Sequence, residues 1–255
     1  MNRLIPILLL NNESLIKTVK FNKFSYIGDP CNTIRIFNEL EVDELLFLDI
    51  NSSREGRAPN LSILSDIANE CFMPLGYGGG IKDSDEAKKI FDIGFEKVSI
   101  NTRAFIKPDL ITDIAKIFGS QSLVVSIDYK KNLFGKYYVY IKSGRKNIRL
   151  HPEEWAKEVE DRGAGEILLT SIDREGTWQG FDIEMIRRVS NAVSIPVIAH
   201  GGAGKIEHIE QVLKETNVSA VALGSMVVFQ KKGKGVLVNF PTEINKNLTM
   251  KDRFR

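Results

Sequence analysis

The chain has 255 residues, 43% of them hydrophobic, and its positive and negative side chains are interspersed to a net charge of +2. That length matches the roughly 250 residues of a single (β/α)8 barrel, and the apolar content can fill a large core. The absence of a basic tail or an aromatic-studded basic stripe argues against nucleic acid as a partner, and no apolar run approaches the roughly 18 residues of a membrane span.

Cysteine usage indicates a reduced, cytoplasmic protein, because Cys31 and Cys71 occur in no metal-binding or disulfide framework. The apolar run Leu4–Leu10 is best explained as a buried first strand, since it contains a proline and lacks the small-residue cleavage site of a signal peptide. No cluster of histidine, cysteine and carboxylate side chains indicates a metal, and no cofactor is expected.

Short apolar runs alternate with helical patterns along the whole chain. Continuously apolar runs are typical of strands that are covered on both faces. Helix starts are marked between them, as at Asp29-Pro30, where an N-cap residue precedes proline at the first helical position. Eight such alternations predict an α/β fold, a single (β/α)8 TIM barrel over residues 1–255. The predicted strands are Leu4–Leu10, Glu44–Asp49, Met73–Tyr77, Lys97–Ile100, Leu123–Asp128, Glu166–Thr170, Pro196–Ala199 and Ala220–Leu223.

Two segments depart from this regular pattern. Residues 129–148 are long for a connection, and Lys136–Lys142 alternates like a strand, which predicts a hairpin-like insertion after the fifth strand. In the tail, residues 230–255, the stretch Gly235–Pro241 is predicted to be extended and to precede a short polar helix at most. We therefore expect no regular eighth helix.

Two glycine turns share one layout of strand, glycines and helix. The first is Gly78-Gly79-Gly80 and the second is Gly201-Gly202-Ala203-Gly204. Glycines let backbone N–H groups approach a phosphate, and the helix that follows adds partial positive charge. One such turn is a weak signal, but two predict a ligand with two phosphates, a bisphosphate or phosphosugar.

The same spacing indicates an internal repeat. Gly79 and Gly201 are separated by nearly the same number of residues as Asp49 and Asp173. We therefore predict two half-barrels of four βα units, at about residues 1–121 and 122–229.

Reactive groups of (β/α)8 barrels lie at the carboxyl ends of the strands. Asp128 ends the fifth predicted strand and is the best candidate for a general acid or base, the alternative being an aspartate that caps the next turn. The repeat places Leu9 at the matching position of the first strand, and leucine cannot transfer protons. His200 either contacts an anion or fills the barrel mouth. The other strand-end candidates are Asp49, Asn101, Thr102, Thr170, Ser171, Asp173 and Ser225.

A charged layer is predicted at the opposite rim. Arg3, Glu44, Lys97 and Glu166 each stand at the start of an apolar strand and can point inward together. Physics alone favours a salt-bridged plug, although an ion ring is costly unless it is well paired, so a functional role is the alternative.

These motifs identify a family. The chain resembles the cyclase subunit of imidazole glycerol phosphate synthase, the HisF family, from Met1 to about Phe229. The resemblance is carried by Asp43–Ile50, Gly78–Ile81, Lys97–Thr102, Phe118–Gln121, Gly163–Arg174 and Gly201–Gly204.

The resemblance implies a glutaminase (HisH-like) partner at the barrel floor and ammonia that travels through the barrel to a ribulosyl bisphosphate at the top. It implies that Asp128 is one of two catalytic aspartates and that Lys17 belongs to a mobile first loop. It makes the ring of Arg3, Glu44, Lys97 and Glu166 a gate on the ammonia path instead of a plug. The implied phosphate sites are Gly79, Gly80, Asn101 and Thr102, and then Gly201, Gly202, Gly224 and Ser225.

Several positions depart from the family pattern. Leu9 occupies the position of the other catalytic aspartate. Glu175 replaces the second aspartate of the family motif Asp-Arg-Asp-Gly-Thr, and His200 replaces the usual serine before the second glycine turn. Loss of one acid or base typically lowers a rate by roughly 10²–10⁴-fold, so the resemblance alone does not imply cyclase activity. The departures resemble divergent HisF-like proteins of glycosyl amidation in surface-polysaccharide pathways, where ammonia goes to a separate sugar amidotransferase.

Three hypotheses follow. The first is a barrel that conducts ammonia for sugar amidation, the second is a working cyclase of L-histidine biosynthesis, and the third is a non-catalytic activator of the glutaminase. A phosphosugar isomerase is less favoured, since such relatives also need an aspartate on the first strand. The final ammonia acceptor and the identity of the phosphate ligand stay open.

Overall fold

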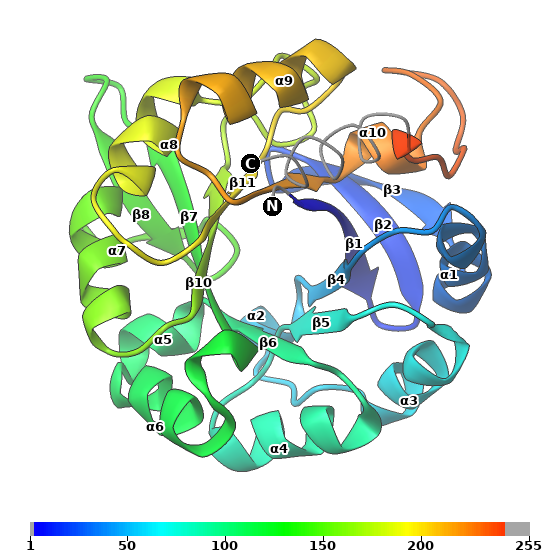
Figure 1. Ribbon diagram of the computed structural model, residues 1–255, viewed down its shortest axis with the longest axis horizontal. Helices are drawn as coiled ribbons and strands as arrows, with labels where there is room; N and C mark the ends of the chain where they lie inside the picture. The colour runs from blue at the N-terminus through cyan, green and yellow to red at the C-terminus, as the bar shows by residue number, and fades with distance from the viewer. Residues whose placement is uncertain (1–2, 243–255) are drawn as a thin grey trace, which may run out of the picture.

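Parallel strands close into a barrel in the computed structural model, which describes residues 3–242 (Figure 1). Around the barrel the strand order is β10-β11-β12-β1-β4-β5-β6-β7, and β7 pairs with β10 to close it. The predicted (β/α)8 TIM barrel is therefore confirmed. The barrel strands are β1 Arg3–Asn11, β4 Leu45–Asp49, β5 Leu75–Gly78, β6 Lys97–Ile100, β7 Leu123–Lys131, β10 Glu166–Ser171, β11 Val197–His200 and β12 Ala220–Leu223.

Helices form a ring outside the barrel (Figure 1). The predicted N-cap Asp29 accepts from Asn32 N at 2.8 Å, and Asp83 caps another helix by accepting from Glu86 N at 2.9 Å. The longer helices are α1 Pro30–Glu39, α3 Leu61–Glu70, α4 Ser84–Ile93, α6 Asp109–Phe118, α7 Pro152–Asp161, α8 Ile183–Ser190 and α9 Ile206–Glu215. Shorter ones are α2 Ser52–Glu55, α5 Thr102–Ile106, α10 Ser225–Val228 and the 3₁₀ turn η1 Ser120–Ser122. No helix within residues 3–242 has the length and apolarity needed to cross a bilayer.

Additional antiparallel strands follow β1 and β7. After β7, the strands β8 (Tyr137–Ile141) and β9 (Lys146–Asn147) form the predicted insertion. After β1, the strands β2 (Ser14–Val19) and β3 (Asn22–Gly28) form a hairpin that the sequence did not predict. Its two turn residues, Lys20 and Phe21, both adopt a positive φ, a conformation that usually selects glycine or asparagine.

Apolar side chains fill two separate layers. The larger layer lies between the strands and the outer helices. The smaller one lies inside the barrel and is contributed by alternate positions of the strands. It comprises Ile5, Ile7, Leu9, Ile16, Leu46, Val124, Leu168, Ile198, Ala220 and Ala222.

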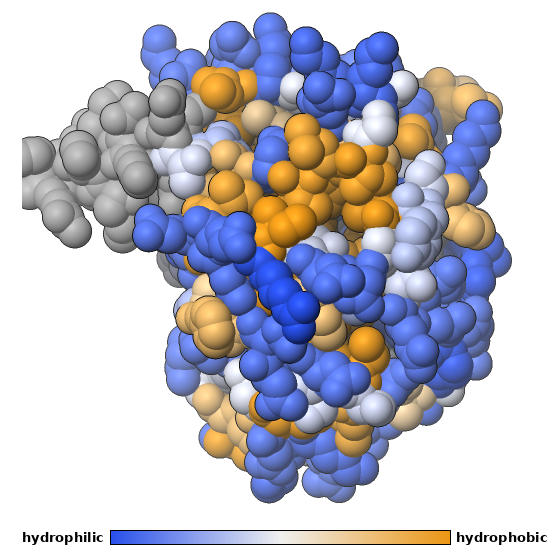
Figure 2. All heavy atoms as spheres, turned by 90° about the vertical axis from the view of Figure 1, so that its right-hand side faces the viewer, coloured by the Kyte–Doolittle hydropathy of each residue, from blue (hydrophilic) through white to orange (hydrophobic). Residues whose placement is uncertain are grey.

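The chain after β12 lacks a full eighth helix within the described residues, as expected. It forms the four-residue α10, and then Val236 makes an antiparallel bridge with Phe229. The short polar helix expected after Pro241 lies outside the described residues. Figure 2 shows hydrophobic surface on the side of the barrel where α10, α1 and β3 lie. Exposed hydrophobic side chains include Ile36 on α1 and Phe24 on β3.

Candidate functional site at the two ends of the barrel

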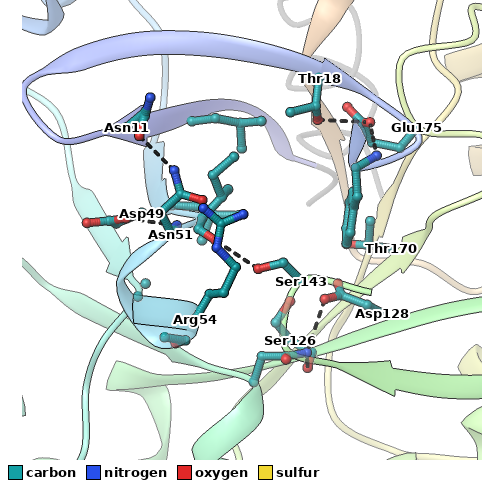
Figure 3. A pocket seen from close by; sticks show the side chains of 18 of the residues that line it. Asn11, Thr18, Asp49, Asn51, Arg54, Ser126, Asp128, Ser143, Thr170 and Glu175 are labelled. Atoms are coloured by element: carbon teal, nitrogen blue, oxygen red, sulfur yellow. Dashed lines mark hydrogen bonds between the residues drawn. The ribbon is translucent and has the colours of Figure 1, made fainter. Parts of the chain in front are cut away.

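A cavity of about 550 Å³ opens at the carboxyl ends of the barrel strands (Figure 3). Its walls come from the β2–β3 hairpin, the loop that contains α2, the β8–β9 turn and the ends of the barrel strands. The candidates that line it are Asp49, Asn101, Thr102, Asp128, Thr170, Glu175, His200 and Gly79, together with Leu9.

Three neighbouring strands place Asp128, Thr170 and His200 in one row. Thr170 is in register with Asp128 on β7 and with His200 on β11. Its hydroxyl lies 3.2 Å from Nδ1 of His200 and also hydrogen-bonds the Asp128 carboxyl. All three side chains are buried, so the row is a connected polar network at the floor of the cavity.

Burial sets the protonation of this row. Desolvation raises the pKa of Asp128 to about 7, with the Thr170 hydroxyl opposing the rise. Desolvation, together with the charge of Lys17, lowers the pKa of His200 to about 3. The imidazole is therefore neutral at pH 7, whereas Asp128 can hold or release a proton near that pH, as a general acid or base requires.

Leu9 belongs to an apolar wall of the same cavity. It packs in the inner core with Ile16, Leu48 and Ile50 and is only 6% exposed. Its partner on β4 is Leu48. The wall therefore offers no acid or base where the family resemblance places the second aspartate.

The first glycine turn borders two cavities. Gly79 has φ +128°, and a Cβ there would lie 2.5 Å from the Asp49 carbonyl oxygen, so only glycine fits. Gly78 and Gly79 line the large cavity, while Gly80 lines an adjoining cavity of about 190 Å³. The smaller cavity is lined by the basic side chains Arg57, Lys82, Arg103 and Lys142.

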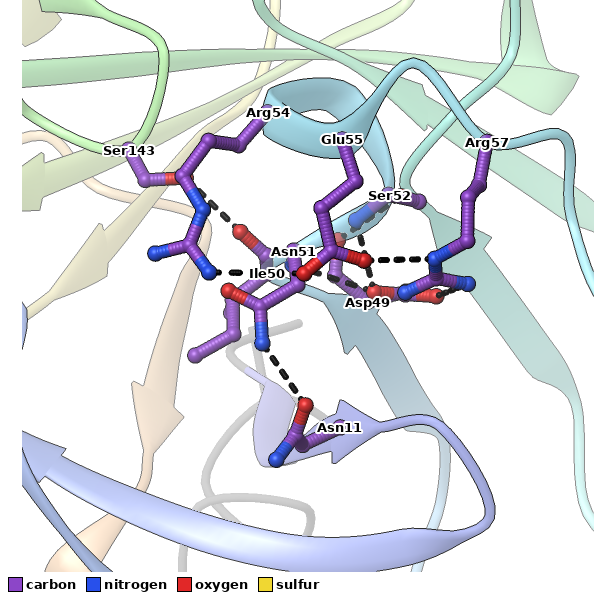
Figure 4. Close-up of polar contacts among 9 residues, drawn as sticks. All are labelled: Asn11, Asp49, Ile50, Asn51, Ser52, Arg54, Glu55, Arg57 and Ser143. Carbon is purple, nitrogen blue, oxygen red and sulfur yellow. Dashed lines mark hydrogen bonds and ion pairs between the residues drawn. The ribbon is translucent and has the colours of Figure 1, made fainter.

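Asp49 supports the α2 loop beside this turn (Figure 4). Its Oδ1 accepts hydrogen bonds from Asn51 N at 3.1 Å and Ser52 N at 2.9 Å, and its Oδ2 lies 3.6 Å from Arg57 Nη1. Asp49 thus lines the cavity but its carboxylate is already engaged in a turn. The part it plays in positioning the loop is one that strand-end position alone does not reveal.

The second glycine turn is covered by protein. Gly202 accepts a hydrogen bond at 2.8 Å from Gly180 N, and a Cβ on Gly204 would lie 2.8 Å from Cβ of Trp178. A Cβ on Gly224 would lie 2.8 Å from Cε of Lys17. Neither cavity is lined by the second set of predicted phosphate residues, Gly201, Gly202, Gly224 and Ser225.

Lys17 and Glu175 join the first hairpin to the loop after β10. Their side chains form a buried ion pair, and Glu175 Oε2 also accepts from Thr18 Oγ1 at 3.1 Å and Phe21 N at 3.3 Å. The Glu175 carbonyl accepts from Lys20 N at 3.0 Å. These bonds hold the strained Lys20-Phe21 turn over the barrel mouth.

Asp173 and Ser171 also lie away from the lining of the two cavities. Asp173 Oδ2 accepts a hydrogen bond at 2.9 Å from Lys131 N and so contacts the β7–β8 hairpin. Ser171 is buried within β10. In exchange, the fold brings in polar residues that no motif marks: Asn11, Asn51, Arg54, Ser143 and Arg145.

The β8–β9 turn explains part of that difference. Ser143 Oγ donates to the Ile50 carbonyl at 2.7 Å, and Lys142 N donates to Thr102 Oγ1 at 3.0 Å. Both Lys142 and Ser143 adopt a positive φ. The two hydrogen bonds hold the insertion against Ile50 and Thr102, which are contacts between distant segments that no local sequence pattern marks.

The predicted charged ring is assembled at the floor. Lys97 Nζ lies 2.9 Å from Glu44 Oε1 and 2.8 Å from Glu166 Oε2. Arg3 Nη1 lies 2.6 Å from Glu44 Oε2, and its other terminal nitrogen pairs with Glu166. Each base bridges both acids, so the ring closes the amino-terminal end of the barrel.

Within residues 3–242, no group of three or more His, Cys, Asp and Glu side chains is arranged to hold a metal ion. At the top face, Asp128 can transfer a proton near pH 7, and Thr170 and His200 can form hydrogen bonds with a ligand.

Comparisons with known proteins show the family to which the chain belongs. A family model described as "Histidine biosynthesis protein" matches residues 3–233. A Pseudomonas aeruginosa protein, provisionally named imidazole glycerol phosphate synthase subunit hisF2, is 50% identical over 96% of this chain and 97% of its own length. Provisionally named HisF subunits from Leptospira borgpetersenii and Vibrio vulnificus are 46% and 42% identical, each over 96% of this chain and over 96% and 95% of their own lengths. The chain therefore belongs to the HisF family of imidazole glycerol phosphate synthase subunits.

Proposed function

We propose that this protein is the barrel subunit of a glutamine amidotransferase system and conducts ammonia for the amidation of a sugar. A glutaminase would dock at the floor and release ammonia beneath the ring of Arg3, Glu44, Lys97 and Glu166. The barrel would then conduct the ammonia to its top face. The observation that carries the proposal is Leu9, an apolar residue in the wall where a cyclase would need an acid or base.

The interior of the barrel supports passage of a neutral molecule. Above the charged ring, the inner layer consists of apolar side chains such as Ile5, Leu46 and Leu168, and Leu9 continues it to the cavity. Ammonia is small and uncharged, whereas ammonium would lose its hydration without a compensating partner. An apolar barrel interior therefore favours passage of ammonia over ammonium. The ammonia stays unprotonated, and so reactive, until it reaches the polar row of Asp128, Thr170 and His200.

The decisive experiment is a cyclase assay with excess ammonium and the histidine-pathway substrate, on wild type and Leu9→Asp together. We expect wild-type turnover to be lower than that of an ordinary cyclase by roughly 10²–10⁴-fold, because one acid or base is missing. Recovery in Leu9→Asp would show that this residue separates the two functions. Turnover of the wild type near that of an ordinary HisF would refute the proposal.

The second candidate is a working cyclase of L-histidine biosynthesis. Asp128 favours it, since this buried carboxyl has the pKa of a general acid or base. A working cyclase should rescue a cyclase-deficient histidine auxotroph when it is supplied with its glutaminase. Failure of rescue by soluble, partnered protein would count against this candidate.

The third candidate is a scaffold that only activates the glutaminase. A substitution in the charged ring at the floor, where Lys97 pairs with Glu44 and Glu166, distinguishes such an activator from an ammonia conduit. A pure activator should tolerate Lys97→Ala, with its stimulation of glutamine hydrolysis unchanged. In a conduit the same change would uncouple glutamine hydrolysis from incorporation of nitrogen into product.

A further inference from the structure

The two predicted phosphate sites are not equivalent in this chain. The first glycine turn borders both cavities, whereas the second borders neither. We infer that the barrel mouth binds a ligand with one phosphate, held at the first glycine turn, and that the Glu175 carboxylate takes the place of a second phosphate. This inference rests on the proposed function, because it names the ligand class of the cavity that would receive ammonia.

Glu175 occupies donor groups of the β2–β3 hairpin, one of which, Lys17, lies beside Gly224 of the second predicted phosphate site. Its carboxylate pairs with Lys17, whose Cε and Nζ would lie 2.8 Å and 3.5 Å from a Cβ on Gly224. It also accepts from the Thr18 hydroxyl and the Phe21 amide. An ammonium, a hydroxyl and a backbone N–H are the donors that a phosphate would use.

A second phosphate would also meet unfavourable charge. To reach Gly224 it must approach Glu175, which is buried with its ion-pair partner. Like charges repel more strongly at a buried site than in water, because the local dielectric is low. Binding there would require the ligand to displace Glu175 and release the β2–β3 hairpin.

The first turn presents the opposite environment. The cavity beside Gly80 is lined by Arg57, Lys82, Arg103 and Lys142 and by no acidic side chain. Nη2 of Arg57 is buried and has no hydrogen-bond partner within the described residues. An unsatisfied buried guanidinium nitrogen in a basic cavity is a built donor for an anion.

The strand-end side chains of the large cavity suit an uncharged ligand body, whereas the loop side chains that line it include the basic Lys23, Arg54 and Arg145. Thr170, Asn101 and His200 offer hydrogen bonds, and Leu9 with Ile16 offers an apolar surface. Hydroxyl groups of a sugar satisfy such polar groups without bringing a second charge. The ligand class is therefore a sugar monophosphate or a similar phosphate monoester.

Calorimetric titration of the purified chain tests this inference. The probes are ribose 5-phosphate and fructose 1,6-bisphosphate, at matched ionic strength and without a glutaminase. We expect the wild type to bind both with affinities that differ by less than about tenfold, because one phosphate is recognised in each case. Absence of ribose 5-phosphate binding at millimolar concentration, or a bisphosphate preference above about tenfold, would overturn the inference.

Two variants separate the two turns. Glu175→Gln should strengthen bisphosphate binding about tenfold while leaving ribose 5-phosphate unchanged, since it removes the competing charge. Glu207→Gln, which removes an exposed charge on α9, should change neither. Arg103→Ala should weaken both ligands about tenfold. Unchanged bisphosphate affinity in Glu175→Gln, or unchanged affinities in Arg103→Ala, would contradict the assignment, and neither outcome bears on ammonia delivery.

Discussion

Lys97 Nζ lies 2.9 Å from Glu44 Oε1 at the floor of the barrel, and this pair forms part of a closed ring with Arg3 and Glu166. Glu44 and Glu166 are each only 7% exposed. Partly buried charges of this kind depend on their partners, because water cannot replace them.

A double-mutant cycle on this pair should therefore reveal coupling. We expect Lys97→Met and Glu44→Gln each to lower the free energy of unfolding by about 1–3 kcal/mol, and the double variant to lose less than the sum. Urea unfolding measures this. The control is Lys88→Met in an exposed pair with Asp92, which should lose less than about 0.5 kcal/mol. Additive losses at the ring would contradict the coupling.

Leu9→Asp should destabilise the protein, whatever it does to activity. Leu9 packs with Ile16 and Ile7 in the inner core, where a carboxylate loses hydration. We expect a loss of about 2–4 kcal/mol at pH 8 and a smaller loss at pH 5, because the introduced carboxyl is protonated more readily there. Chemical denaturation at both pH values gives the two losses. An equal loss at both would mean that the new side chain reaches solvent.

The buried Asp128 should make stability depend on pH. Its pKa in the folded protein is about 7, against 3.8 in the ordinary state. Between these values the folded state binds more protons than the unfolded state, so the free energy of unfolding falls as pH rises from about 4 to 7.

Asp128→Asn removes that contribution and provides the measurement. Relative to the variant, the wild type should lose stability by a few kcal/mol, up to about 4, between pH 4 and pH 7. His200 titrates in both proteins, so the comparison cancels its contribution. That contribution has the opposite sign: because the pKa of His200 is lowered, it raises the free energy of unfolding as pH rises from about 3 to 6.5. Parallel pH profiles for the two proteins would show that Asp128 is not shielded from water.

Gly79→Ala should abolish phosphate binding at the first turn. At φ +128° a Cβ would meet the Asp49 carbonyl oxygen at 2.5 Å, so the α2 loop must move. Gly94→Ala is a matched control, because Gly94 has φ +116° but no atom within 4 Å of its added Cβ. We expect the control to lose about 1 kcal/mol of stability and to bind ribose 5-phosphate normally. Equal binding by both variants would remove Gly79 from the site.

The two hairpins differ in how far the sequence predicts them. The β8 strand follows from the alternation Tyr-Tyr-Val-Tyr-Ile, a local pattern that depends only on neighbouring residues. The β2–β3 hairpin could not be predicted, because its turn is Lys20-Phe21 instead of the usual glycine or asparagine. It is held by hydrogen bonds to Glu175, a residue that is distant from the hairpin in the sequence. The division into two half-barrels stays a prediction.

The sequence by itself determined the barrel, the positions at the strand ends and the loss of the first-strand carboxylate at Leu9. These features depend on strand and helix periodicity and on residue identity, which are local. Only the tertiary structure decided that the first glycine turn borders two cavities, whereas the second packs against Gly180 and Trp178. That difference arises because burial of the Lys17–Glu175 pair joins residues 158 positions apart, and because Arg57, Arg103 and Lys142 from separate segments meet beside Gly80. The two glycine turns are alike in sequence, and their surroundings in space set them apart.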